Sequence, residues 1–267
     1  MMEYAQLLLQ NLALSAALFV LLWLINLLTR DPSFIDSWWP IGMVVTAWAT
    51  YAFVGHTGAH ATLLTILCTI WGLRLGLYLL WRWRKHGPDR RYVTMMAAAQ
   101  KERGWGYARA SLLLVFALQL PLQFIVSLPV QLGQMGGRPL GPVGWLGGAL
   151  AVVGVLFESI GDFQLVAFKA DPANAGKVLQ TGLWRYTRHP NYFGDACVWW
   201  GFWVIAVDAG TGLWSMLGPI LITVVLTRWS GVPTVEGSMR RKRPEYEAYV
   251  QRTSSFIPMP PRKAVSP

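Results

Sequence analysis

The densest group of polar and aromatic residues in the sequence lies between residues 182 and 195. Arg185, Arg188 and His189 stand immediately before Pro190. Proline favours the first position of a helix, where the N–H groups of the first turn are free to bind an anion. Cationic side chains, a helix N-terminus and aromatic rings therefore meet in one short segment. This combination suits a cofactor that carries both phosphate groups and a ring.

A simpler interpretation of this segment is an aromatic belt at a membrane boundary, with arginines that set the orientation of the chain. That interpretation explains the rings and the arginines. It does not explain Asn191 and Asp195, which lie one turn apart inside the apolar stretch that begins after Pro190. We therefore favour a binding role for the segment.

A second group of polar residues lies inside an apolar stretch, where charge is costly. Arg74, Tyr78 and Arg82 fall at i, i+4 and i+8, so a helix places them on one face. This face either binds an anion or orients a substrate, or else Arg74 is a structural counter-ion for a buried acid.

Two acids, Glu158 and Asp162, are also four residues apart in an apolar stretch, and Lys169 follows them. Carboxylates on adjacent turns repel unless they share a proton, a cation or a ligand that carries hydroxyl groups. Arg74 or Lys169 could neutralise them. Otherwise the acids would form hydrogen bonds with the ribose or amide groups of a nucleotide.

Asp36 comes just before the apolar residues 38–55. An acid in this position is commonly the N-cap of the helix that follows, because its oxygens accept from the free N–H groups of the first turn. The alternative is a place in a substrate cavity.

The C-terminal tail, residues 230–267, is expected to form two short helices. Glu236 and Arg240 are i and i+4 on the first, and Tyr246 and Tyr249 lie on the second. The tail is either a basic amphipathic segment that lies on the membrane or a cover that closes over the cofactor from the cytoplasmic side.

The composition indicates which elements position these residues. Of the 267 residues, 54% are hydrophobic and only 13% are charged, and the mean hydropathy is +0.38. A soluble domain has roughly 25% charged residues, so the chain is expected to be an all-α integral membrane protein. Cys68 and Cys197 both lie in apolar stretches, which indicates neither a disulfide framework nor a metal site.

Seven apolar stretches are long enough to cross about 30 Å of hydrocarbon, which takes about 20 helical residues. With no internal repeat, they form one membrane domain over residues 1–267. The expected spans are 5–28, 38–55, 61–81, 110–132, 143–166, 192–208 and 212–229.

The charge distribution predicts the orientation of the seven spans. The chain has 23 Lys and Arg and a net charge of +10. Most of them fall on one side if the N-terminus is outside and the C-terminus is cytoplasmic, as the positive-inside rule requires. The basic charge therefore belongs to cytoplasmic loops that meet anionic lipid or an anionic cofactor, and nucleic acid is not an expected partner. The Lys and Arg residues assigned to the cytoplasmic side lie in 29–37, 82–109, 167–191 and 228–267.

The segment from Thr181 to Asp195 resembles the G-x-x-x-x-x-R-H-P-N-Y-x-G-D signature of the membrane sterol reductases of the C14 and C7 type. The whole chain resembles the bacterial branch of the steroid 5α-reductase-like family over roughly residues 36–260. The tail with Glu236, Tyr246 and Tyr249 is similar to the C-terminal pattern of that family. So is the stretch that contains Trp71, Gly72, Arg74, Arg82, Asp89, Arg91 and Tyr92.

The resemblance implies an inner-membrane, multi-pass enzyme that uses NADPH to reduce an activated C=C bond in a lipid or steroid-like substrate, with its active site facing the cytoplasm. The family's Gln-Glu acid pair has no match in the second span, and its partner tyrosine falls near Trp71. Tyr78, Asp36 and Tyr92 are therefore the expected proton donors, with Arg74, Arg82 and Glu158 in substrate or structural roles. The expected cofactor-binding residues are Asp162, Lys169, Arg185, Arg188, His189, Asn191, Tyr192, Asp195, Glu236, Arg240, Tyr246 and Tyr249.

A second family leaves an alternative open. The membrane isoprenylcysteine carboxyl methyltransferases, which use S-adenosylmethionine, share Arg-His-Pro-x-Tyr-x-Gly and a tail glutamate. Asn191 and Asp195 fit the reductase pattern better, and Glu236, with no second acid beside it, fits the methyltransferase tail less well. A non-catalytic lipid-binding or transport protein is the third possibility, although transporters commonly contain internal repeats.

Overall fold

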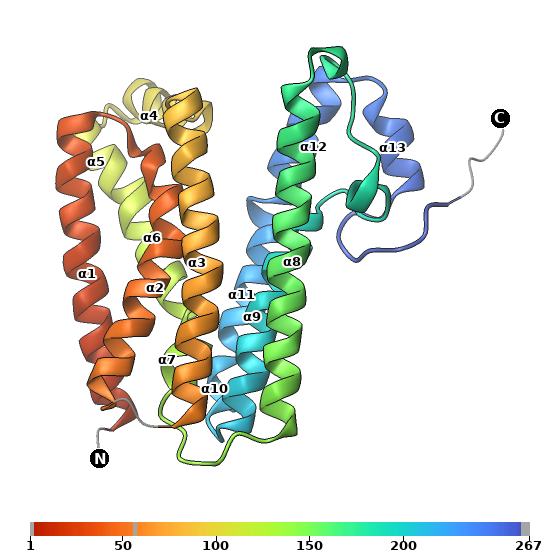
Figure 1. The fold of residues 1–267 in the computed structure, drawn as a ribbon. Helices are drawn as coiled ribbons and strands as arrows, with labels where there is room; N and C mark the ends of the chain where they lie inside the picture. The colour runs from red at the N-terminus through yellow and green to blue at the C-terminus, as the bar shows by residue number, and fades with distance from the viewer. Residues whose placement is uncertain (1–2, 56–57, 263–267) are drawn as a thin grey trace. The chain divides into compact units, whose positions relative to one another are not determined.

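The computed structural model describes residues 3–55 and 58–262. Over these ranges the chain is helical and contains no strand, as the sequence predicts (Figure 1). Two segments of extended backbone meet in an isolated parallel bridge between Thr187 and Ser254. Residues 263–267, the end of the predicted tail, lie outside the described residues.

Within the described ranges, five helices are long and apolar enough to cross a membrane. This finding supports a membrane protein. The expected second and sixth spans also fall on helices, α2 (Ile35–Phe53) and α9 (Pro190–Asp208), of 19 residues each. The five long helices are Tyr4–Thr29, Ala59–His86, Tyr107–Gly133, Pro142–Ala170 and Gly212–Lys242.

The chain divides into two compact units, and the first contains residues 1–145 and 202–218. In this unit α2 packs against α3. Gly72 allows the two helices to come this close: a Cβ at this position would lie only 2.7 Å from the carbonyl oxygen of Pro40. The helices of this unit are α1 (Tyr4–Thr29), η1 (Pro32–Phe34), α2, α3 (Ala59–His86), α4 (Arg90–Arg103), α5 (Tyr107–Ser111), η2 (Leu112–Phe116), α6 (Ala117–Val126), α7 (Leu128–Gly133) and α10 (Gly212–Ser215), with the first residues of α8 and the last of α9.

Buried polar side chains join the helices of the first unit. Asn11 Nδ2 donates to Thr50 Oγ1 at 2.8 Å and to Gln131 Oε1 at 3.0 Å. His60 Nε2 lies 2.7 Å from Asp208 Oδ2. Within an apolar environment such hydrogen bonds hold helices together where apolar packing alone gives little preference.

The second unit contains residues 146–201 and 219–267. In this unit Gly194 lets α9 approach α8 closely: a Cβ at this position would lie 2.6 Å from the backbone nitrogen of Glu158. Its elements are most of α8 (Pro142–Ala170), η3 (Pro172–Asn174), η4 (Gly182–Arg185), most of α9, most of α11 (Leu217–Val224), η5 (Val225–Trp229), α12 (Val232–Lys242) and α13 (Tyr246–Arg252).

Two of the predicted spans contain irregular turns within their long helices. The stretch 110–132 becomes α5, the π-helical turn η2, α6 and α7, with Pro121 inside α6 and Pro129 at the start of α7. Proline lacks the N–H that an α-helix needs, and π turns absorb an extra residue. The stretch 212–229 is likewise divided at Met216. The two helices expected in the tail are confirmed as α12 and α13.

Candidate active site

Pro190 begins α9, as the sequence predicts. The turn just upstream, η4, requires glycine at its start: Gly182 has a φ of +60°, and a Cβ there would lie 2.3 Å from the side-chain nitrogen of Gln164. Gln164 Oε1 accepts a hydrogen bond from the Leu183 N–H at 3.0 Å. This contact fastens the segment that leads into α9 to helix α8.

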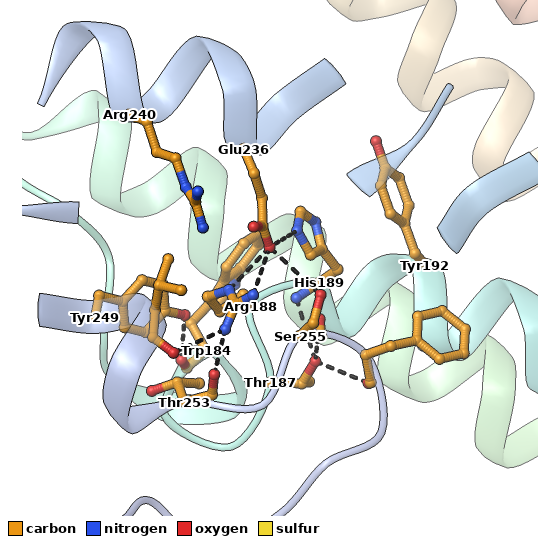
Figure 2. A network of polar contacts seen from close by, with 12 residues as sticks. Trp184, Thr187, Arg188, His189, Tyr192, Glu236, Arg240, Tyr249, Thr253 and Ser255 are labelled. Carbon is orange, nitrogen blue, oxygen red and sulfur yellow. Dashed lines mark hydrogen bonds and ion pairs between the residues drawn. The ribbon is translucent and has the colours of Figure 1, made fainter. Parts of the chain in front are cut away.

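Arg188, His189 and Glu236 form a buried cluster, which Figure 2 shows between the start of α9 and helix α12. Glu236 Oε1 lies 2.8 Å from Arg188 Nη2, 2.9 Å from Arg188 Nε and 3.2 Å from His189 Nε2. The Arg188 side chain is 8% exposed and that of Glu236 is 11% exposed. A buried ion pair is tolerated only when its geometry is good and its other donors are satisfied. The charge of Arg188 is therefore compensated inside the protein.

Arg188 also donates to the backbone at the end of α13 and just after it. Its Nη1 donates to the carbonyl oxygen of Val250 at 3.1 Å and to that of Thr253. The Arg188 N–H donates to the carbonyl oxygen of Ser254 at 2.9 Å, next to the parallel bridge that Ser254 forms with Thr187. Arg188 thus fastens the C-terminal segment to the start of α9.

Tyr246 and Tyr249 of α13 are buried beside this cluster. Their rings meet edge-on with 5.8 Å between centroids, and the Tyr249 hydroxyl donates to the Trp184 carbonyl oxygen. Burial, and then the nearby Glu236 carboxylate, raises the pKa of Tyr246 to about 12. Burial also raises the pKa of Tyr249 above its ordinary value. Both phenols are therefore protonated at physiological pH, and Tyr249 acts as a hydrogen-bond donor.

The two acids of α8 are buried, with Glu158 3% and Asp162 5% exposed. Asn191 Nδ2 donates to Asp162 Oδ1 at 3.2 Å. The helices come close enough for this bond because Gly161 lies against the start of α9, where a Cβ would be 3.1 Å from the Pro190 ring. An amide and a carboxylate side by side offer both a donor and acceptors to a polar ligand.

The other expected residues near the start of α9 are distributed around this cluster. Tyr192 stacks on His189 with 5.2 Å between centroids and 3° between planes. Asp195 follows one turn after Asn191 and is half-buried. Arg240 Nε lies 3.6 Å from Glu247 Oε2, and both side chains of this ion pair are about half exposed.

Arg185 and Lys169 are both exposed. Arg185 lines a cavity of about 470 Å³. Lys169 lies in the last turn of α8. The family resemblance implies that Arg188, Lys169 and Arg240 neutralise the phosphates of the cofactor. Of these three cations, only Arg188 is buried.

The expected proton donors lie in the first unit, where Asp36 and Tyr92 meet. Asp36 lies inside the first turn of α2 and is not its N-cap. Its carboxylate accepts from the Tyr92 hydroxyl at 2.6 Å and lies 2.8 Å from Arg91 Nη2. Gln119 Nε2 donates to the Tyr92 oxygen at 3.2 Å. Burial and the Asp36 charge raise the pKa of Tyr92 well above its ordinary value, so the phenol keeps its proton.

The predicted polar face of α3 is also present in the first unit. The Arg82 guanidinium carbon lies 6.0 Å from the centroid of the Tyr78 ring, which also stacks on Trp81 at 6.1 Å. Arg74 and Tyr78 are half-buried, and Arg82 is exposed. Arg82 lines a cavity of about 150 Å³ together with Asp36.

Sequence reasoning missed the roles of Arg91, Gln119, Arg252, Thr253 and Arg262. Arg91 precedes Tyr92 and follows Asp89 by two residues, which was a usable signal. Arg252 lies three residues after Tyr249 on α13 and carried a weaker one. No local spacing connects the other three to their partners.

The family whose description is "Protein of unknown function (DUF1295)" matches residues 22–253. The chain belongs to the DUF1295 family. The match includes both the 182–195 segment and Glu236, so the buried cluster lies inside the DUF1295 region. An uncharacterized protein of the fission yeast Schizosaccharomyces pombe is 24% identical to this DUF1295 chain over 285 residues, which cover 93% of the chain and 78% of the yeast protein. No solved structure matches this DUF1295 chain.

Proposed function

We propose that this DUF1295 protein is an NADPH-dependent membrane reductase that acts on an activated C=C bond of a lipid or steroid-like substrate. One observation carries the proposal. The segment that resembles the sterol reductase signature folds inward, with Arg188 and His189 buried against Glu236 and Asn191 bonded to Asp162. Arginines that served only to orient the chain would lie in water or among lipid headgroups.

NADPH supplies the hydride in this proposal. Asn191, Tyr192 and Asp195, with Asp162 beside them, would hold its nicotinamide and ribose, because the buried amide and carboxylate supply hydrogen-bond partners for an amide and for hydroxyl groups. Arg188 acts as a positioning residue that holds the tail in place. Lys169 and Arg240 supply positive charge for the phosphates.

Tyr92 and Asp36 supply the proton. Hydride addition to the β carbon of an enone leaves an enolate, which must receive a proton or a hydrogen bond. The Tyr92 phenol is protonated at neutral pH, and its hydroxyl donates a hydrogen bond to Asp36 at 2.6 Å. Asp36, with a quarter of its side chain exposed, returns a proton from water to the phenol after each turnover.

The proposal includes the arrangement in the membrane. Seven helices span the bacterial inner membrane, with the N-terminus outside and the C-terminus in the cytoplasm. The distribution of Lys and Arg supports this orientation, since 21 of 23 then lie on the cytoplasmic side. The active site then faces the cytoplasm, where NADPH is available.

One observation favours a second candidate, an S-adenosylmethionine-dependent membrane methyltransferase. Arg188 and His189 both bind the single tail acid Glu236, which is the set of residues shared with the isoprenylcysteine carboxyl methyltransferases. Asn191 on Asp162 is the feature that this candidate leaves unexplained.

Titration of the purified protein with each cofactor separates the candidates. A ligand that binds only the folded state at 100 times its Kd stabilises that state by about 2.7 kcal/mol. We expect NADPH to raise the unfolding temperature and S-adenosylmethionine to leave it unchanged. The opposite result would favour the methyltransferase, and a response to neither would favour a non-catalytic lipid-binding or transport protein.

Asn191→Ala tests the site itself. Loss of a hydrogen bond to a charged group costs about 1.5–3 kcal/mol, so NADPH should bind at least about tenfold more weakly. Asn174→Ala is the matched control, because Asn174 bonds only to its own turn near Asp171 and Phe168 among the described residues. Equal NADPH affinity in Asn191→Ala and the wild type would remove the support for this site.

A further inference from the structure

A cavity of about 470 Å³ lies in the second unit, and three arginines contribute to its lining. Its volume falls in the range of about 300–1,000 Å³ that is typical of small-molecule sites. The lining residues are Gln180, Thr181, Gly182, Arg185, Arg252, Thr253, Pro261 and Arg262.

The positive charge of this cavity is not compensated by acids. In the part of the chain that the structure describes, Arg185, Arg252 and Arg262 form no ion pair with a carboxylate. Arg188, which lies nearby in the sequence, is by contrast neutralised by Glu236. Like charges that share a cavity repel, and a bound anion relieves this repulsion.

Protein contacts hold two of the three arginines in place. Arg252 Nη2 donates to Gln180 Oε1 at 2.9 Å, which ties α13 to the segment before η4. The Arg262 N–H donates to the Arg252 carbonyl oxygen at 2.9 Å. The C-terminal segment therefore forms one wall of the cavity. Thr253, which lines the cavity, also accepts from the buried Arg188, as Figure 2 shows.

We propose that this cavity binds a phosphate-bearing ligand through Arg185, Arg252 and Arg262. Guanidinium groups bind phosphate oxygens through paired N–H donors, and three of the residues that line the cavity carry them. The inference goes beyond the proposed reductase, because the cavity would bind phosphate whether or not the protein reduces anything.

The position of the cavity allows two sources of the phosphate. All its lining residues lie outside the five long apolar helices, between Ala170 and α9 or after Lys242. Both a soluble phosphate compound and the headgroup of an anionic lipid could reach such a site. The chemistry of recognition is the same for both.

The soluble arm measures binding of inorganic pyrophosphate to the full chain in neutral detergent by isothermal titration calorimetry. We expect saturable binding that weakens as salt is added. Arg185→Gln and Arg262→Gln should each weaken it about tenfold, the effect of losing one charge-assisted hydrogen bond. These side chains form no hydrogen bond in the described chain, so both variants should fold. Arg252→Lys keeps the charge of the third arginine and should weaken binding less than Arg252→Gln.

The lipid arm uses nanodiscs of phosphatidylcholine with and without phosphatidic acid, and native mass spectrometry then counts the lipid that remains bound. Retention of phosphatidic acid by the wild type and its loss in Arg185→Gln would identify a lipid headgroup as the source. The matched control in both arms is Arg241→Gln, an exposed arginine of α12 outside the cavity.

The inference is overturned if neither probe binds, or if the three cavity variants bind both probes as Arg241→Gln does. NADPH titration of the same samples keeps the two proposals apart. A protein that binds pyrophosphate or phosphatidic acid but not NADPH retains the cavity site and loses the reductase. A protein that binds NADPH with equal affinity in the wild type and all three arginine variants, and binds neither probe, retains the reductase alone.

Discussion

Glu236→Gln tests whether the buried cluster holds the C-terminal segment in place. The carboxylate is the shared acceptor for Arg188 and His189, at 2.8–3.2 Å. Glutamine keeps the volume of the side chain and removes its charge. Arg188 would then keep neutral acceptors, among them the carbonyl oxygens of Val250 and Thr253, but lose its charged partner.

The expected loss of stability follows from the burial of the pair. The two side chains are 8% and 11% exposed, so solvent screens their interaction little. Removal of one partner from a buried ion pair costs about 3–5 kcal/mol, and we expect the lower value because the glutamine oxygen still accepts a hydrogen bond. For a chain of this size, about 3 kcal/mol lowers the unfolding temperature by roughly 6–12 °C.

The assay is thermal unfolding in detergent, followed by tryptophan fluorescence, together with limited proteolysis of the segment after α13. Glu247→Gln is the control, since it removes the half-exposed partner of Arg240 and should cost less than about 1 kcal/mol. In a cycle with Arg188→Gln, the double variant should lose less stability than the sum of the single variants. An unfolding temperature for Glu236→Gln equal to that of Glu247→Gln, or effects that add, would refute the reasoning.

Two further predictions concern the first unit. Tyr92→Phe removes the hydrogen bonds to Asp36 and from Gln119; NADPH oxidation with an enone lipid should fall by at least about 10²-fold while NADPH affinity is kept, and an unchanged rate would exclude Tyr92 as the proton donor. Burial opposes ionisation of Asp89, but the hydrogen bonds and charge of Arg91 outweigh it and hold the pKa of the carboxyl below its ordinary value. This stabilisation is complete above about pH 4 and is lost as the pH falls through the lowered pKa. Unfolding temperatures measured from pH 7 to pH 3 should therefore fall further for the wild type than for Asp89→Asn, and parallel curves would contradict the assignment.

The positions of the helices could be predicted because their signals are local. Long apolar stretches predicted every long helix, and Pro190 predicted the start of α9. The irregular turns at Leu112–Phe116 and Met216 were harder to predict. A π turn or a break depends on how a helix packs against its neighbours, and the sequence of the segment itself contains little information on that packing.

The candidate site was predicted in part. The segment 182–195, Asp162 and Glu236 were all identified as polar positions worth explaining, because charged or amide groups in apolar surroundings are costly. Their pairing was not identified. Asn191 was not named as a partner of the α8 acids, and the structure shows it bonded to Asp162.

The sequence by itself determined that this is an apolar, all-helical chain and which of its residues required a polar partner. Composition and spacing report on single segments, and both follow from the residues within a few turns. Only the tertiary structure decided that Glu236 meets Arg188 across 48 residues and that Tyr92 meets Asp36 across 56. Such pairs depend on which helix faces pack together, because a hydrogen bond or an ion pair forms only within about 3 Å and packing alone brings distant segments that close.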